Sequence, residues 1–316
     1  MRARFLGRLT DLAAAAQTSE RLLAARPDDA AAHLEHARAL SGIHEFSGAL
    51  GELEAAAALR APEAEVRSER ASVLLAMGRE DEAASLGEGP RQGAPIGDFV
   101  TAAGILSKAG RLEASDRLFE AARTSYRDVS PFTVAWIDFE RARALEARGD
   151  RGAARAYLSE AVAVLPCYAH AVVHLAALET PEDALRHLSV LDATSDDPDV
   201  VAAEADALRR SGRLPEAEAK VSQARARFEE VVTALPEAYA DHAASFYLGE
   251  GRDAPRALTL ARANAANRAT SEAVELWLTA AIAAGSAEEQ CAAAKAVVEH
   301  PGSSLKELRA TVRACR

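Results

Sequence analysis

The chain has 316 residues, about twice the length of an ordinary single domain, so two globular domains or one extended array would both account for it. Hydrophobic residues make up 49% and charged residues 27%, which excludes intrinsic disorder, and an aromatic content of 5% means that Ala and Leu supply most apolar surface. The formal net charge of -11 opposes binding to the phosphate backbone of a nucleic acid.

The chain shows no sign of a membrane span or of secretion. Its Ala-rich runs are broken by charges well short of the ~18 to 20 apolar residues that a spanning helix needs. Near the N-terminus, Arg8 and Asp11 interrupt what would be the apolar core of a signal peptide, so we interpret this segment as a mature helix. Three cysteines, at Cys167, Cys291 and Cys315, are too few and too scattered for a disulfide framework. We expect a soluble protein of a reducing cytoplasm; a periplasmic or secreted location stays open, because a chain that had lost its leader would look the same.

Strand signals are nearly absent, because β-branched residues never alternate over a strand-length window, and this predicts an all-α fold. One spacing recurs along the chain: a small residue is followed three positions later by Leu and twelve positions later by another small residue. The six cases are Ala37, Leu40, Ala49; Ala71, Leu74, Ala83; Ala103, Leu106, Ser115; Ala142, Leu145, Ala154; Ala205, Leu208, Ala217; and Ser245, Leu248, Ala257. In four of them a glycine lies seven positions after the first small residue, at Gly78, Gly110, Gly149 and Gly212.

This spacing is typical of a helical hairpin. Two antiparallel helices approach closely only where side chains are small, and a glycine between them allows the positive φ of a tight turn. Each case therefore predicts one hairpin, whose second helix packs against the next.

At these residues the chain resembles the tetratricopeptide repeat family, whose unit is a helix-turn-helix of ~34 residues. Ala37 and Ala71 are 34 positions apart, as are Ala142 and Ala176. The resemblance covers roughly residues 30 to 300. It implies a right-handed α-solenoid of about eight hairpins with terminal capping helices. The Trp and Tyr of the family's first helix are mostly replaced by Ala, Leu or charged residues, which weakens the case for any named subfamily. We expect a divergent, bacterial-type member.

In chain order, we expect five segments. They are an N-terminal cap or half repeat (1–29), two repeat units (30–84), a Gly/Pro-rich break (85–98), six further units (99–301) and a C-terminal capping helix (302–316). The fifth unit is predicted to be short, with Thr180 as a helix cap and Pro181 at the first helical position. In the sixth unit, Pro215 is predicted to open a long helix that reaches Leu235.

Function in such a superhelix is expected on the concave face, which the first helix of each hairpin lines. The candidate contact residues are Trp136, Phe139 and Arg143 in the fourth unit, His170, Val173 and His174 in the fifth, and Tyr239, His242 and Phe246 in the seventh. We expect a protein or peptide partner with an apolar or basic segment, held by aromatic anchors, with Glu140 or Asp241 nearby for charge. The alternative is that Trp136 and Phe139 only fill the gap left by the insertion before them.

A second hypothesis is metal binding at Cys167, His170 and His174. The two histidines lie four positions apart on one helix face, and the thiolate precedes them by three, so the set could hold zinc or copper in a metal-trafficking or metal-sensing accessory protein. Against this, Cys167 lies at an inter-helix junction, where small buried residues are common. No phosphate-binding glycine loop, nucleophile elbow or HExxH motif is present. The sequence therefore favours a non-enzymatic interaction scaffold without a cofactor.

Overall fold

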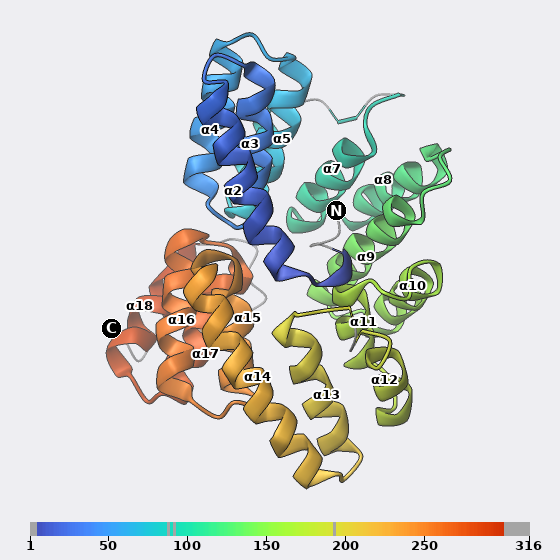
Figure 1. Ribbon diagram of the computed structural model, residues 1–316, viewed down its shortest axis with the longest axis vertical. Coiled ribbons are helices and arrows are strands. Elements are labelled where there is room, and N and C mark those ends of the chain that lie inside the picture. The colour runs from blue at the N-terminus through green and yellow to red at the C-terminus, as the bar shows by residue number, and fades with distance from the viewer. Residues whose placement is uncertain (1–4, 87–88, 91–92, 192–193, 300–316) are drawn as a thin grey trace. The chain divides into compact units, whose positions relative to one another are not determined.

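The computed structural model describes residues 5–86, 89–90, 93–191 and 194–299. Within these residues every regular element is an α-helix and no strand occurs, which confirms the all-α prediction (Figure 1). The helices are α2 (Leu9–Ala25), α3 (Ala30–Gly42), α4 (Phe46–Ala58), α5 (Glu63–Ala76), α6 (Glu80–Ser85), α7 (Ile96–Lys108), α8 (Leu112–Ser125), α9 (Pro131–Ala147), α10 (Arg151–Val164), α11 (Ala169–Ala176), α12 (Pro181–Leu188), α13 (Pro198–Arg210), α14 (Leu214–Ala234), α15 (Pro236–Leu248), α16 (Ala254–Asn267), α17 (Ser271–Ala283) and α18 (Ala287–Glu299).

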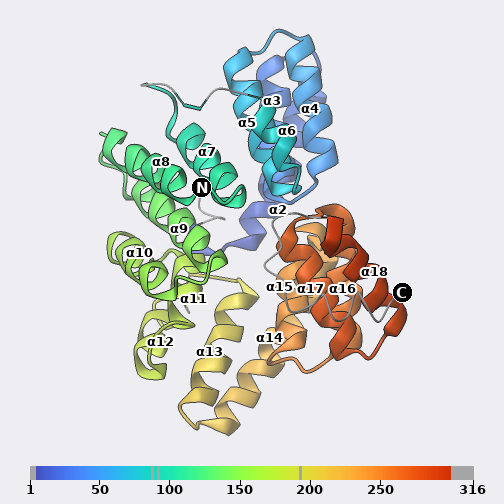
Figure 2. The same ribbon diagram turned by 180° about the vertical axis from the view of Figure 1, so that it is seen from behind.

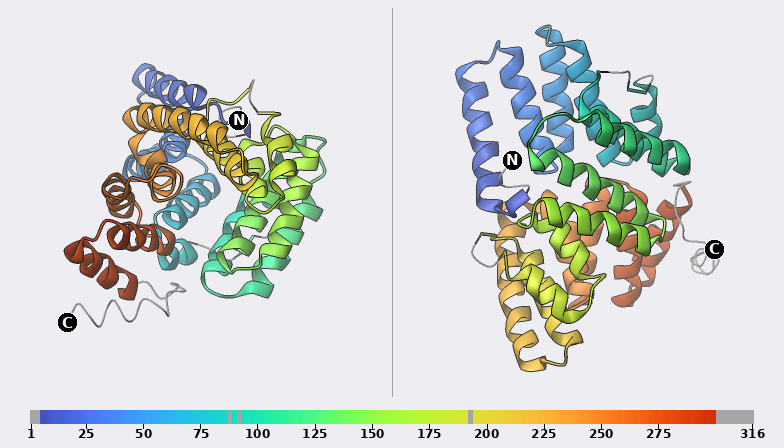
Figure 3. Two further views of the ribbon diagram at one scale, coloured as in Figure 1. Left: turned by 90° about the horizontal axis from the view of Figure 1, so that it is seen from below. Right: turned by 90° about the vertical axis from the view of Figure 1, so that its right-hand side faces the viewer.

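From α3 onward, the helices of the described residues pair in order into eight hairpins, the number expected from the repeats. Within a hairpin, the two helices lie side by side and run in opposite directions (Figure 3). In the α9–α10 hairpin, Ala142 and Ala154 are both fully buried, as the predicted close approach requires. The seventh hairpin departs from the predicted register, because Ser245 is exposed while Ala243 and Ala244 are buried. The predicted C-terminal capping helix, 302–316, lies outside the described residues.

Among the described residues, seven of the eight hairpin turns share one backbone conformation, and the short turn between α11 and α12 is the exception. All four predicted glycines have positive φ, between 72° and 81°, and so does Gly285 in the last hairpin. In the first and seventh hairpins, His44 (φ 60°) and Arg252 (φ 47°) occupy the same position, two residues before the second helix, and adopt the same left-handed conformation. Each costs about 1–2 kcal/mol relative to glycine. The turn geometry is therefore kept even where the residue does not favour it.

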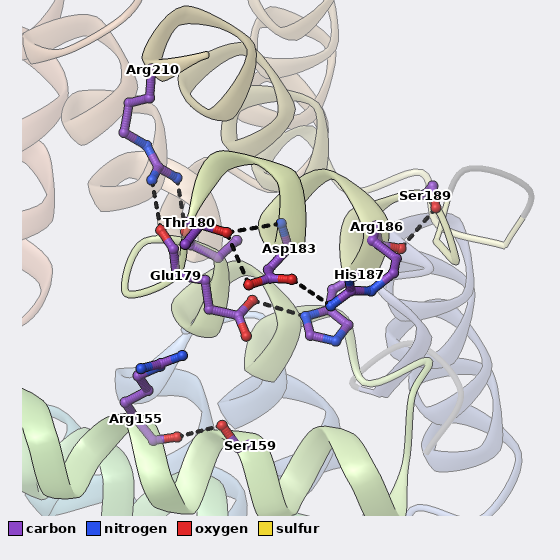
Figure 4. A network of polar contacts seen from close by, with 10 residues as sticks. Arg155, Ser159, Glu179, Thr180, Asp183, Arg186, His187, Ser189 and Arg210 are labelled. Atoms are coloured by element: carbon purple, nitrogen blue, oxygen red, sulfur yellow. Dashed lines mark hydrogen bonds and ion pairs between the residues drawn. The ribbon is translucent and has the colours of Figure 1, made fainter.

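The predicted irregularities of the fifth and sixth hairpins are confirmed. Thr180 caps α12 by accepting a hydrogen bond from the backbone N–H of Asp183 (3.3 Å), and Pro181 opens the helix. Figure 4 shows this cap together with Arg210 of α13, whose guanidinium donates to the carbonyl oxygens of Glu179 and Ala176, both at 2.9 Å. These bonds satisfy the carbonyl of Ala176, the last residue of α11, and that of Glu179 in the turn that follows. The next second helix, α14, is the longest described, with 21 residues.

The described residues form two compact units. Unit 1 holds the residues up to Gln17 and Ala84–Arg227; unit 2 holds Thr18–Ala83 and the residues from Phe228 onward. Figure 2 shows their helices from the opposite side. In unit 1, Asp196 accepts hydrogen bonds from the backbone N–H groups of Leu9 (2.5 Å) and Thr10 (3.3 Å), so a distant loop caps α2.

Unit 2 joins the first two hairpins of the chain to the last two. Asn267 donates a hydrogen bond from Nδ2 to the carbonyl oxygen of His44 (3.0 Å). The backbone N–H of Ala269 donates to the carbonyl oxygen of Met77 (3.1 Å). Gly78 allows this approach, because a Cβ there would lie 2.7 Å from the carbonyl oxygen of Ala269. The turns of the first two hairpins thus dock against the C-terminal end of α16 and the segment that links it to α17.

None of the described helices combines the length and the apolar character that a membrane crossing would require.

Candidate functional site

In unit 1, α9 carries three of the predicted contact residues in different environments. Trp136 is partly buried and donates a hydrogen bond from Nε1 to Oε1 of Glu140 (2.9 Å), whereas Arg143 is exposed. Phe139 is only 5% exposed. Its ring packs against Tyr168, with the ring centroids 5.1 Å apart. The prediction that Phe139 is an open anchor is therefore wrong, since packing between neighbouring hairpins buries it.

On α11, the predicted residues His170, Val173 and His174 are half-buried beside Phe139. The two imidazoles meet the Phe139 ring edge-on, at centroid distances of 6.3 and 5.4 Å. His174 donates from Nδ1 to Oε2 of Glu146 on α9 (2.8 Å). The first helices α9 and α11 are thus neighbours, and Trp136, Arg143, His170, Val173 and His174 remain at least partly accessible.

The structure does not assemble the metal site suggested by Cys167, His170 and His174. Among the residues with described positions, no group of three or more His, Cys, Asp or Glu side chains is arranged to hold a metal ion. The two histidines face different carboxylates instead, because Nε2 of His170 lies 4.0 Å from Asp197 while His174 pairs with Glu146. The spacing along α11 therefore places both imidazoles against Phe139 and beside carboxylates.

In unit 2, the predicted anchors on α15 are also buried. Tyr239 is 4% exposed and Phe246 is 6% exposed, and only His242 keeps partial access. Phe246 stacks on Phe228 of α14 with the ring centroids 4.7 Å apart. Tyr239 packs against the imidazole of His242 at 5.1 Å. Both predicted anchors are core residues of the seventh hairpin, which corrects their assignment to an open groove.

A cavity of about 340 Å³ lies beside these residues in unit 2. Side chains of α15, α17 and the C-terminal end of α16 line it: Asp241, Ser245, Asn264, Arg268, Glu272, Ala273, Glu275, Leu276 and Thr279. Two adjacent first helices, α15 and α17, form most of its wall. The cavity is therefore lined mainly by side chains of first helices.

The polar core of this cavity is a chain of three side chains. Arg268 forms an ion pair through Nη2 with Oδ2 of Asp241. Its Nε donates to Oδ1 of Asn264 (3.0 Å). Asn264 is 2% exposed. Because Nε can only donate, this bond fixes the orientation of the Asn264 amide and directs its Nδ2 away from Arg268.

Within this group of three side chains, two buried atoms have no hydrogen-bond partner in the structure: Oδ1 of Asp241 and Nδ2 of Asn264. Nε2 of His242 lies 4.0 Å from Oδ1, which is too long for a hydrogen bond. Leaving a buried donor or acceptor unpaired costs about 1–3 kcal/mol each.

The electrostatics of the cavity keep Asp241 ionised. Burial alone would raise the pKa of Asp241, but His242 and Arg268 outweigh burial and hold this pKa below its usual value. The neighbouring His44 behaves oppositely, since burial and the Arg268 charge lower its pKa to about 4. Near pH 7, the site therefore presents a carboxylate beside a neutral His44.

Unit 1 contains a larger cavity, of about 440 Å³, between α12, α13 and α14. Its charged side chains are already paired, Lys220 with Glu204 and Arg213 with Glu216. Neither pair leaves the kind of buried, unpartnered atoms found in unit 2. We therefore take the unit 2 cavity as the stronger candidate site.

Of this site, sequence reasoning identified only Asp241. It missed Asn264 and Arg268 because they lie on or just after a second helix, and Glu272 and Glu275 because no contact residue was predicted for the eighth hairpin. A signal existed in α16, where Ala257, Leu260, Ala261 and Asn264 follow the spacing of a buried helix stripe. An amide at the end of an apolar stripe indicates a polar contact in the interior.

Comparison with known proteins finds likeness in structure alone. No protein-family model and no curated protein sequence matches the chain. Among solved structures, the chain is similar to the human IFIT1 dimer with PPP-AAAA (12% identity, TM-score 0.48), covering 86% of this chain and 72% of that one. A tetratricopeptide repeat protein from Parabacteroides merdae gives 15% identity and a TM-score of 0.43, covering 79% and 98%. YrrB, described as a TPR protein with an unusual peptide-binding site, gives 14% and 0.34, covering 70% and 97%.

These TM-scores all lie below 0.5, so the assignment of the fold rests on the chain's own helices. The evidence is the succession of hairpins, their buried small residues and their left-handed turns. The chain has an all-α fold of tetratricopeptide-like helical hairpins.

Proposed function

We propose that the chain is a non-enzymatic protein-interaction scaffold or peptide-binding adaptor that holds its partner on first-helix side chains. One observation carries the proposal: the adjacent first helices α15 and α17 line an open cavity of about 340 Å³ with polar and charged side chains. A surface of this kind suits a short segment of another protein, which can lie across neighbouring helices.

In unit 1, the partly accessible side chains of α9 and α11 extend this proposal. Trp136, Val173 and His174 offer apolar and aromatic surface, and Arg143 adds an exposed charge. Large, partly buried aromatics such as Trp136 often dominate the free energy of binding at protein interfaces. The partner is an apolar or basic segment, because the net charge of -11 attracts cations and repels nucleic acid.

The test begins with peptides selected from a random library against the full chain. Binding of each selected peptide is then measured to wild type, to Trp136→Ala and to Thr279→Arg, which fills the unit 2 cavity. The proposal expects at least one first-helix variant to weaken binding by about 2 kcal/mol. Glu160→Ala, an exposed change on the second helix α10, is the control and should bind as wild type does. Wild-type affinity in both first-helix variants would contradict the proposal.

A further inference from the structure

We propose that residues 5–10 act as an intramolecular ligand on unit 1, and that a partner segment of the same chemistry, an aromatic residue followed two positions later by glycine, replaces them there. The site lies at the N-terminal ends of the first helices α9, α11 and α13, within unit 1. This inference rests on the proposed function, because it gives the chemistry of a partner for these first helices.

The first observation is an aromatic anchor. Phe5 is buried, and its ring lies 5.1 Å from that of Phe132 on α9, measured between centroids. It also meets the ring of Tyr168, the N-cap residue of α11, edge-on at 4.8 Å. Tyr168 in turn contacts Phe139 of α9. Phe5 therefore enters an aromatic cluster made by two neighbouring first helices, and a ring held in this way is typical of the residue that anchors a peptide on a protein.

The second observation is recognition of the main chain. The carbonyl oxygen of Gly7 accepts hydrogen bonds from the backbone N–H of Asp196 and from the hydroxyl group of Ser195, both at 3.0 Å. The carboxylate of Asp196 accepts from the backbone N–H of Leu9 (2.5 Å). Both loop residues lie just before α13. Main-chain groups of any peptide with the right shape can make these bonds, so a segment of another protein can take over the position.

The third observation is the close fit at Gly7. Its φ is 58°, and an added Cβ would lie 2.5 Å from Oγ of Ser195 and 2.9 Å from Cβ of Ala169, the first residue of α11. Glycine satisfies both the left-handed conformation and the close approach. The site therefore selects glycine two positions after the aromatic residue.

The segment can leave without unwinding α2. The carbonyl oxygen of Arg8 accepts from the backbone N–H groups of Asp11 (3.1 Å) and Leu12 (3.3 Å), and its Nε lies 3.3 Å from Oδ2 of Asp11. These contacts keep Arg8 with the first turn of α2. Phe5 and Gly7, in contrast, are held by residues more than a hundred positions along the chain.

Departure of the segment defines what a partner must bring. The rings of Phe132 and Tyr168 would lose the contact with Phe5, and the backbone N–H of Asp196 would lose its acceptor. Because leaving apolar rings in water and a donor unpaired is unfavourable, the vacated site favours a segment that supplies an aromatic ring and a carbonyl oxygen at the same spacing.

The experiment measures fluorescence anisotropy of a labelled synthetic peptide, with the sequence of residues 2–12, on the full chain. In wild type the peptide binds only those molecules whose own segment has left the site. Gly7→Ala detaches that segment, so the peptide should bind this variant at least about tenfold more tightly than wild type. Gly149→Ala is the matched control: this turn glycine of unit 1 has a φ of 81°, and a Cβ there meets no atom within 4 Å. It should bind the peptide within about twofold of wild type.

Two altered peptides separate recognition of the segment from attraction by net charge. Peptides carrying Phe5→Ala or Gly7→Ala keep the charge of the native peptide. Each should bind the Gly7→Ala chain at least about tenfold more weakly than the native peptide does, because one lacks the anchor ring and the other carries the Cβ that the site excludes.

A second measurement uses wild type alone. In nuclear magnetic resonance spectra of the ¹⁵N-labelled chain, saturating unlabelled peptide should move the amide signals of Leu6 and Gly7 to random-coil positions, since the peptide then occupies their place. If Gly7→Ala fails to fold, this measurement decides between the two results.

Three results would overturn the inference: equal affinity of the peptide for wild type and Gly7→Ala, equal binding of the peptide that lacks the phenylalanine, or unchanged Leu6 and Gly7 signals. Absence of binding to a folded Gly7→Ala chain would overturn it as well, by showing that the segment is a fixed part of the fold. In each case, library peptides that bind wild type and lose affinity in Trp136→Ala would leave the proposed adaptor function standing. Failure of the library peptides to bind would overturn both.

Discussion

Replacing Gly78 with alanine should destabilise unit 2 far more than the same change at Gly285. Both glycines occupy hairpin turns with positive φ, 78° and 69°. At Gly285, an added Cβ would meet no atom within 4 Å. At Gly78, it would lie 2.7 Å from the carbonyl oxygen of Ala269 and 2.9 Å from Cα of Thr270. The two variants therefore share the backbone cost and differ in the contact between early and late hairpins.

The expected magnitudes follow from these contacts. The left-handed conformation costs an alanine about 1–2 kcal/mol in either variant. Gly78→Ala must in addition push the turn away from residues 269–270, which breaks the hydrogen bond between Met77 and Ala269, worth about 1 kcal/mol. Strain from overpacking against rigid backbone adds about 1–3 kcal/mol. We expect Gly78→Ala to be less stable than Gly285→Ala by about 2–4 kcal/mol.

The assay is denaturant unfolding of the full chain, followed by circular dichroism, with amide hydrogen exchange as a local readout. Gly78→Ala should lower the unfolding midpoint and accelerate exchange of the Ala269 amide, whereas Gly285→Ala should leave that amide protected. Equal destabilisation by the two variants, with unchanged exchange at Ala269, would refute the docking of the second hairpin against this segment.

Three further predictions concern the packing of the α9–α10 hairpin, the protonation of His44 and the Gly/Pro-rich break predicted at 85–98. Ala142→Leu or Ala154→Leu should overpack the α9–α10 crossing and lower thermal stability by about 1–3 kcal/mol; unchanged melting would refute the repeat register. Folding lowers the pKa of His44 from 6.5 to about 4, because burial disfavours the charged imidazole. The free energy of unfolding should therefore be unaffected by His44 above pH 6.5 and should fall as the pH drops towards 4. The loss is up to about 3 kcal/mol, at about 1.4 kcal/mol per pH unit. His44→Asn, which tolerates the left-handed turn, should flatten this profile of unfolding midpoint against pH. Limited proteolysis should cleave first within 87–97, as the Gly and Pro content predicts, and uniform exchange protection there would contradict it.

The hairpins could be predicted from the sequence because their determinants are local. Small residues twelve positions apart, such as Ala142 and Ala154, lie on facing helices whatever the rest of the chain does. A turn glycine such as Gly149 signals positive φ by itself. His44 and Arg252 adopt the same turn without that signal, so neighbouring helices impose the conformation on them.

The site could not be predicted to the same degree, because exposure depends on residues distant in the sequence. Phe139 and Phe246 occupy first-helix positions, yet rings from neighbouring helices bury both. The interactions that define the cavity join Asp241 to Asn264 and Arg268 across two helices. The docking of Met77 against Ala269 joins residues almost two hundred positions apart and follows no local pattern.

The central claim is that partners bind on first-helix side chains, and a hydrogen-exchange footprint of a library-selected peptide on the full chain tests it most directly. The account predicts slower exchange on binding in α15 and α17, or in α9 and α11, with second helices such as α10 and α16 unchanged away from the cavity. Protection confined to second helices, with first helices exchanging as in the free protein, would contradict the account.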